Sequence, residues 1–186
     1  RSLINLGVEV IDLVQLHCPP SEICGKKETY EMMDQIVKKG KINYYGVSVE
    51  KVSEALDAIK YPNVKSIQII FNVFRQKPSE IFFKEAKKNN VAIIARVPLA
   101  SGLLTGKMNS QSSFPENDHR NYNINGDAFD VGETFSGINF AKGLEAVEEL
   151  KKIKPNDFSL TDLSLKWILS HPEVTVVIPG AKNKIC

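Results

Sequence analysis

Short apolar runs alternate with longer amphipathic stretches along the chain. Runs rich in branched residues have the length of strands, whereas apolar positions three and four residues apart predict helices. The pattern predicts strands at 11–16, 42–47, 66–71, 91–97 and 174–178, and helices at 2–6, 28–39, 49–59, 78–89, 139–153 and 160–170. Gly40 and Asn90 stand where helices should end, and Ser159 with Asp162 is close to a capping box.

Strands that alternate with helices and are rich in branched residues are typical of a parallel sheet covered on both faces. An open doubly wound sheet and a closed eight-stranded barrel both fit this order. No strand is followed by the G-x-G-x-x-G turn of the open nucleotide-binding fold. A TIM barrel needs eight βα units, typically in about 250 residues. We therefore expect residues 1–186 to form a single domain that supplies about five βα units of a TIM (β/α)8 barrel cut at both termini.

The interval from Met108 to about Gly137 interrupts the alternation. It is polar and rich in Asn, and loops of this length inside compact domains are usually functional lids or disordered segments. We expect one of these two for this interval.

The composition is that of an ordinary globular protein. Of the 186 residues 42% are hydrophobic and 25% charged, and the net charge of +2 gives no reason to expect nucleic acid or a membrane as partner. Residues 1–25 hold no apolar run long enough for a signal peptide or a membrane span. These features predict a cytoplasmic protein whose partner is a small molecule.

The cysteines are Cys18, Cys24 and Cys186. An odd number argues against a disulfide framework and for reduced thiols inside a cell. His17, Cys18 and Cys24 lack the paired close spacings of a zinc site, so no metal is expected.

Residues that follow the predicted strands are the candidates for chemistry, because parallel α/β folds carry their sites at the carboxyl ends of the strands. His17 follows the first strand, and a histidine there can donate to a carbonyl or close the strand end through a backbone bond. The segment Ser101–Lys107 combines small residues with a hydroxyl and a cation, a combination suited to binding a pyrophosphate. The alternative is that it is a plain surface loop. Gly180 and Lys182 follow the last strand, where barrels often bind phosphate, although such a lysine is often only solvated.

Four segments in this order resemble the aldo-keto reductases. They are 7–17, ending in His17; 40–48, with Tyr45-Gly46-Val47-Ser48; 97–107; and 177–181. The resemblance covers nearly the whole chain outside 108–137, and it implies that the five strands are the fourth to eighth of the barrel.

The resemblance also implies roles for individual residues, with NADP(H) as the cofactor. His17 corresponds to the histidine of a catalytic tetrad, Ser48 and Gln68 to the residues that hold the nicotinamide carboxamide, and Arg96 to a residue that stacks on the nicotinamide ring. Val49 stands where many relatives have asparagine. The remaining cofactor residues implied are Pro98, Leu99, Ser101, Gly102, Leu103 and Lys107 in the pyrophosphate loop, and Gly180 and Lys182 at the 2′-phosphate.

By the same resemblance, the protein is expected to reduce aldehydes or ketones with NADPH. The aspartate, tyrosine and lysine of the tetrad belong to earlier barrel units, and Tyr44 and Tyr45 cannot be given the tyrosine's role on position alone. The chain alone is therefore expected to be inactive. The alternatives are a non-catalytic nucleotide-binding or regulatory protein of the same fold, or an inactive truncated product. If the chain is truly truncated, its sheet has open edges at 11–16 and 174–178, and we expect these edges to be covered by self-association or by rearranged termini. The alternative is that the missing strands are present in the protein.

Overall fold

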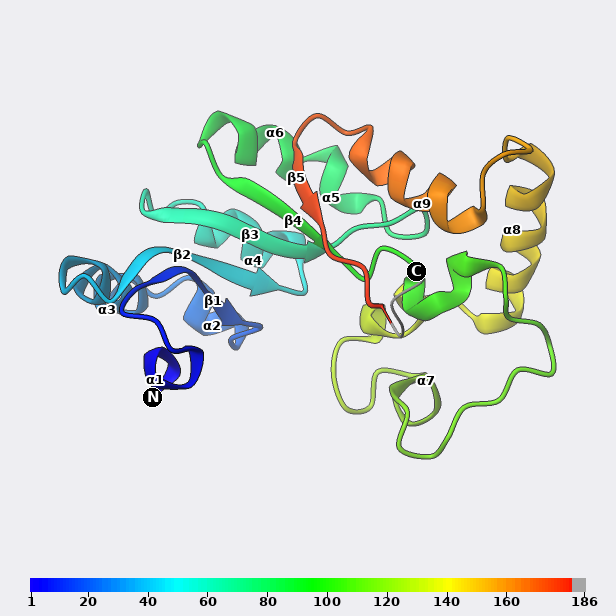
Figure 1. The fold of residues 1–186 in the computed structure, drawn as a ribbon, viewed down its shortest axis with the longest axis horizontal. Helices are drawn as coiled ribbons and strands as arrows, with labels where there is room; N and C mark the ends of the chain where they lie inside the picture. Colours follow the sequence, from blue (N-terminus) through cyan, green and yellow to red (C-terminus); the bar gives the residue numbers. More distant parts are fainter. Residues whose placement is uncertain (182–186) are drawn as a thin grey trace. The chain divides into compact units, whose positions relative to one another are not determined.

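A computed structural model describes residues 1–181, and it contains the predicted alternation of strands and helices (Figure 1). The strands are β1 (Ile11–His17), β2 (Ile42–Val49), β3 (Val64–Ile70), β4 (Ala92–Arg96) and β5 (Val174–Val177). The α-helices are α1 (Ser2–Leu6), α2 (Ser21–Cys24), α3 (Lys27–Lys38), α4 (Val52–Ala58), α5 (Lys77–Glu80), α6 (Phe82–Lys88), α7 (His119–Tyr122), α8 (Phe140–Ile153) and α9 (Leu160–Leu169). The 3-10 helices are η1 (Ala100–Thr105), η2 (Val131–Glu133) and η3 (Phe135–Gly137).

The five strands form one sheet in the order β1-β2-β3-β4-β5, which is their order in the chain. β1 pairs with β2 and β2 with β3 in parallel, so the predicted parallel arrangement is confirmed for these strands. Parallel neighbours joined through helices place the ends of successive strands at the same edge of the sheet.

The chain divides into two compact units, and the division passes through the end of β3 and the middle of β4. The first unit comprises Arg1–Ile69 and Lys77–Ile94; the second comprises Ile70–Gln76 and the residues from Ala95 onward. In the first unit α3 and α4 pack against β2, and Val47 of β2, Ile67 of β3 and Phe82 of α6 are fully buried. In the second unit, η1 packs with α8 and α9 around a core of Ala100, Leu103, Leu104, Phe135, Val147 and Leu160.

Two predicted helices differ from the structure. The helix expected at 49–59 begins only at Val52, because Val49 continues β2 and the Glu54 carboxylate accepts a 3.0 Å hydrogen bond from the backbone N–H of Lys51. The helix expected at 78–89 is broken into α5 and α6 at Ile81, whose φ of −127° and ψ of −52° are not helical. Helix α2 was not predicted.

The other predicted helices agree with the structure to within one residue at each end. Gly40 and Asn90 end their helices with φ of 64° and 56°, and Ser159 forms the capping box with Asp162. Asn139 caps α8 by accepting a hydrogen bond from the Lys142 N–H. Each of these residues either ends the helix or pairs a backbone group that would otherwise lack a hydrogen bond at the helix end.

The polar segment 108–137 contains short helical turns and buried side chains. It holds α7, η2 and η3, and Asn123, Thr134 and Phe135 are at most 1% exposed. The buried polar side chains of Asn123 and Thr134 hydrogen-bond to each other, whereas Asn117, Asn121 and Asn125 are exposed.

β1 and β5 stand at the two ends of the strand order. Leu13 on β1 is 38% exposed, and Val176 on β5 is 42% exposed. Apolar side chains on edge strands are therefore open to solvent, as the sequence pattern predicts. Among residues 1–181, no helix combines the length and the apolar character needed to cross a membrane.

Candidate functional site: a polar row on three strands and a strained loop after β4

In the first unit, the expected residues His17, Ser48 and Gln68 lie side by side on adjacent strands. His17 pairs in register with Ser48, and Ser48 pairs with Gln68. The backbone N–H of Cys18 donates to the Ser48 carbonyl at 2.9 Å, which extends the pairing by one residue. The parallel register therefore brings together three residues that are widely separated in the sequence. We call these three residues the polar row.

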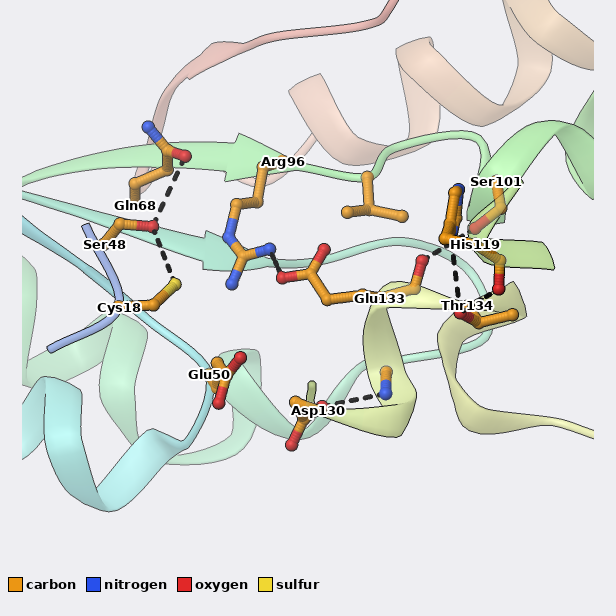
Figure 2. A network of polar contacts seen from close by, with 12 residues as sticks. Cys18, Ser48, Glu50, Gln68, Arg96, Ser101, His119, Asp130, Glu133 and Thr134 are labelled. Carbon is orange, nitrogen blue, oxygen red and sulfur yellow. Dashed lines mark hydrogen bonds and ion pairs between the residues drawn. The ribbon is translucent and has the colours of Figure 1, made fainter. Parts of the chain in front are cut away.

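The side chains of the polar row offer hydrogen-bonding groups to a small ligand. The Ser48 hydroxyl is fully buried and lies 3.5 Å from Gln68 Oε1, to which it donates, and 3.6 Å from the Cys18 sulfur. Figure 2 shows Gln68 turning its amide oxygen toward Ser48 and its amide nitrogen away. The His17 side chain is exposed. A hydroxyl, an amide and an imidazole at one strand edge suit a neutral ligand that carries carbonyl or carboxamide groups.

A second polar layer supports the polar row from two residues earlier on each strand. The Gln15 amide nitrogen donates to the Ser66 hydroxyl at 2.7 Å, and Gly46 lies between them on β2. A Cβ at Gly46 would clash with the hydroxyl and carbonyl oxygens of Ser66, so this crossing requires glycine. The other amide atom, Gln15 Oε1, is buried without a hydrogen-bond partner among the described residues. Sequence reasoning did not single out this layer.

The two tyrosines of β2 differ in their environment. The Tyr45 hydroxyl donates to Asp34 of α3 at 2.8 Å, and burial together with this carboxylate raises the pKa of Tyr45 above its ordinary value. Tyr44 is 57% exposed. Tyr45 is therefore held as a protonated structural group against α3 and is not available as a proton donor to a ligand.

In the second unit, Arg96 ends β4 and forms an ion pair with Glu133 of η2 (Figure 2). The Arg96 side chain is 8% exposed and the Glu133 side chain 20% exposed, so the pair is largely withdrawn from water. Arg96 was expected at the site from the sequence. Glu133 was missed, because it lies in a segment without periodicity, and only its spatial contact with Arg96 marks it.

The loop after β4 has an unusual backbone. Val97, Ala100, Ser101 and Gly102 have φ of 51°, 46°, 57° and 96°, and Gly106 has a φ of 70°. Non-glycine residues rarely adopt this region, and strained backbone of this kind concentrates at functional sites. Successive backbone N–H groups in turns of mixed handedness can form a concave site for an anion.

The side chains of the same loop have different surroundings. Pro98 and Leu103 are buried, and Leu103 belongs to the core of the second unit, so its side chain is not available to a ligand. Leu99 is partly buried against the same core, and Lys107 is exposed. A phosphate here would therefore meet backbone groups and the Lys107 ammonium.

The Ser101 hydroxyl is engaged within the chain. It donates to the Glu133 carbonyl at 2.8 Å and accepts from the Phe135 N–H at 3.1 Å. Asn72, fully buried, adds a second link by donating to the Val97 carbonyl and to the Ser136 hydroxyl at 2.8 and 2.7 Å. The segment 133–136 therefore fixes the strained loop through hydrogen bonds on both sides.

The structure describes only part of the expected 2′-phosphate subsite, which comprises Gly180 and Lys182. β5 continues beside β4 through a 3.0 Å hydrogen bond from the Ile178 N–H to the Ala95 carbonyl, and Gly180 follows in an exposed segment. A Cβ at Gly180 would meet nothing within 4 Å. Lys182 lies outside the described residues.

Comparisons with known proteins agree with one another. A profile of the Aldo/keto reductase family matches residues 1–184. The chain is 30% identical over 98% of its length to the uncharacterized oxidoreductase YqkF of Bacillus subtilis, and 30% identical over 98% to the aldo-keto reductase yakc [NADP(+)] of Schizosaccharomyces pombe. The chain spans 54% and 52% of these two relatives, about half of their length.

Solved structures give the same result. A glycerol dehydrogenase of Gluconobacter oxydans matches with a TM-score of 0.73 and 30% identity, over 95% of this chain and 51% of its own chain. The chain supplies about five βα units of the TIM barrel that these neighbours share, which confirms the expected fold class. This chain belongs to the aldo/keto reductase family.

Proposed function

We propose that the protein reduces aldehydes or ketones with NADPH, and that this chain carries most of the cofactor site together with His17. The observation that supports this proposal most is the polar row, in which a buried hydroxyl and an amide lie in register beside an exposed histidine. NADPH, when bound, supplies the hydride that reduces the carbonyl carbon. The residues of this chain bind and orient the two reactants.

The residues fit the cofactor by the chemistry of their donors. A carboxamide has one acceptor and two donors, which match the hydroxyl of Ser48 and the amide of Gln68. His17 is adjacent in register and orients the carbonyl of the substrate by a hydrogen bond. Arg96 offers a planar guanidinium for stacking on the nicotinamide ring.

The loop 97–107 is proposed to wrap the pyrophosphate. Its succession of left-handed residues presents backbone N–H groups, and Lys107 adds a positive charge. Because the Ser101 hydroxyl is already bonded within the chain, its backbone rather than its hydroxyl is the group proposed to face the phosphate. Gly180 and Lys182 are proposed to hold the 2′-phosphate.

The 186-residue chain alone is proposed to be inactive as a reductase, since the family resemblance gives a counterpart in it for His17 but not for the aspartate, tyrosine and lysine of the tetrad. We further propose that residues 1–186 form one domain, that the protein is cytoplasmic, and that the substrate is a small carbonyl compound.

Two lysine variants separate the phosphate subsites. Lys182→Ala should weaken NADPH binding by roughly 1 to 3 kcal/mol, as expected for a charge-assisted hydrogen bond, and should leave NADH binding almost unchanged. Lys107→Ala should weaken both cofactors, because both carry the pyrophosphate. The measurement is a fluorescence titration of each protein with NADPH and NADH. Equal losses for both cofactors in Lys182→Ala would remove Lys182 from the 2′-phosphate pocket, and a wild-type protein that binds neither cofactor would contradict the proposed function.

A further inference from the structure

Asn72 is a fully buried polar residue to which the family resemblance assigns no role. Its exposed fraction is 0%, and its amide nitrogen donates to the Val97 carbonyl at 2.8 Å and to the Ser136 hydroxyl at 2.7 Å. Its Oδ1 accepts from the backbone N–H groups of Phe74 and Arg75 at 2.9 and 3.2 Å. A carbonyl only accepts and a backbone N–H only donates, so these partners fix which way the amide points.

The pairing of β3 with β4 brings Asn72 to the start of the strained loop. The Phe71 N–H donates to the Arg96 carbonyl at 3.4 Å, so the next residue of each chain segment, Asn72 or Val97, lies beside the other. All four residues belong to the second unit. The Asn72 amide therefore meets the loop 97–107 at its first residue.

Val97 has a backbone conformation that its own sequence disfavours. Its φ is 51°, and a β-branched residue is a genuine outlier in this region. Val97 also precedes Pro98, and a residue before proline is shifted toward extended backbone. Besides the Asn72 amide, the Val97 carbonyl accepts the Ala100 N–H at 3.1 Å, so its orientation sets the first turn of the loop. Contacts from outside the loop are needed to hold this turn, and the Asn72 amide supplies one.

We propose that Asn72 is a positioning residue for the cofactor: its amide keeps the start of the loop 97–107 in the shape that receives the pyrophosphate before the cofactor arrives. The inference rests on the proposed function, because it takes this loop as the pyrophosphate site. Without the hydrogen bond to Val97 the loop would relax for part of the time, and the observed Kd would rise as the competent fraction falls. Every ligand that carries the pyrophosphate would be weakened alike.

Asn72→Ser removes the hydrogen bond to Val97 without adding a charge. The serine side chain is one bond shorter, whereas its hydroxyl can still accept from the Phe74 N–H in a local turn. Kd should rise on the order of 10-fold, by the same factor for NADPH, NADH and 2′-phospho-ADP-ribose, as expected when a strained backbone residue is released. NADH lacks the 2′-phosphate and 2′-phospho-ADP-ribose lacks the nicotinamide, so an equal factor identifies the pyrophosphate that all three share.

Asn123 provides a matched control in the segment 108–137. It is also 0% exposed, its amide nitrogen donates to the Thr134 hydroxyl at 3.2 Å, and its Oδ1 accepts from the N–H groups of Ala128 and Phe129. These hydrogen bonds stay within 123–134 and do not involve the loop 97–107. Asn123→Ser should therefore lower the thermal stability, as the loss of buried hydrogen bonds does, and leave the three Kd values close to those of the wild type.

The experiment titrates the wild type and the two variants calorimetrically with each of the three ligands, below the unfolding temperature measured for each protein. An equal rise of the three Kd values in Asn72→Ser, absent from Asn123→Ser, would support the inference. Unequal factors, unchanged Kd values in Asn72→Ser, or the same loss in Asn123→Ser would overturn it.

Hydrogen exchange of the wild type decides the matter if Asn72→Ser does not fold. The N–H groups of Ala100, Gly102 and Leu104 are hydrogen-bonded within the loop and should exchange slowly even without NADPH. Protection that appears only after NADPH is added would show that the loop is not held in advance and would overturn the inference. Failure of the wild type to bind any of the three ligands would instead overturn the proposed function, and this inference with it.

Discussion

The Gln15 amide nitrogen on β1 reaches the Ser66 hydroxyl on β3 at 2.7 Å, although β2 lies between these two strands. This hydrogen bond can pass across β2 only because Gly46 has no side chain. This bond lies two residues before the polar row on each strand and ties β1, β2 and β3 together directly beneath it.

Gly46→Ala should therefore destabilise the protein strongly. The added Cβ would clash with backbone and side-chain oxygens of Ser66 and would lie 2.9 Å from Gln15 Nε2. Because a strand carbonyl cannot move away cheaply, we expect a loss of about 1 to 3 kcal/mol or more, as for overpacked cores. Urea unfolding measures this loss. Gly25→Ala is the control, since Gly25 has a φ of −96° and open space around its Cβ position; equal effects at the two glycines would contradict this account of the crossing.

Asp118 should contribute stability that depends on pH. It accepts hydrogen bonds from Arg120 Nε and Nη2 at 2.9 and 2.6 Å, and these bonds lower the pKa of Asp118 well below its ordinary value. Arg120 in turn donates to the Ser101 carbonyl and lies over the Phe114 ring. Asp118→Asn should cost about 1 to 2 kcal/mol at pH 7, because the pair is charged but partly exposed.

The direction of the pH dependence follows from the lowered pKa. The folded state favours the ionised carboxyl, so its contribution is complete above the unfolded pKa of about 3.9 and is lost as the pH falls toward the lower folded pKa. The difference in unfolding free energy between the wild type and Asp118→Asn should therefore be smaller at pH 3 than at pH 7. An equal difference at both pH values would show that the carboxylate charge is not what stabilises this loop.

The exposed edge strands predict self-association of the 186-residue chain. β1 and β5 end the strand order and carry exposed apolar residues, and such edges pair with other strands. Sedimentation velocity should show oligomers that increase with protein concentration. Val176→Lys places a charge on β5 and should shift the distribution toward the monomer. A wild-type chain that stays monomeric and folds cooperatively at all concentrations would show this prediction wrong.

The polar row could be predicted because His17 and Ser48 lie at or next to the ends of strands with a clear apolar pattern, and because the family resemblance marks Ser48 and Gln68. Parallel pairing then brings His17, Ser48 and Gln68 together. The break at Ile81 could not be predicted in this way, because no proline or glycine marks it.

Glu133 could not be predicted for a different reason. It lies in a polar segment whose path is set by long-range hydrogen bonds, such as those of Ser101 with Glu133 and Phe135 and that of Asn72 with Ser136. Local propensity carries no information about such contacts. The same holds for Gln15, which appears in the sequence as one polar residue within an apolar strand.

The proposal that the polar row binds the nicotinamide end of NADPH is tested most directly by alkylation of Cys18, whose sulfur lies 3.6 Å from the Ser48 hydroxyl. Cys24 is an internal control, because burial raises its pKa to about 11 and keeps it a poorly reactive thiol at pH 8. Cys186, outside the described residues, is replaced by serine in all samples. Iodoacetamide labelling followed by mass spectrometry should show that Cys18 reacts faster than Cys24 and that saturating NADPH slows the reaction of Cys18 alone. A rate at Cys18 that NADPH leaves unchanged would contradict the assignment of the polar row to the cofactor.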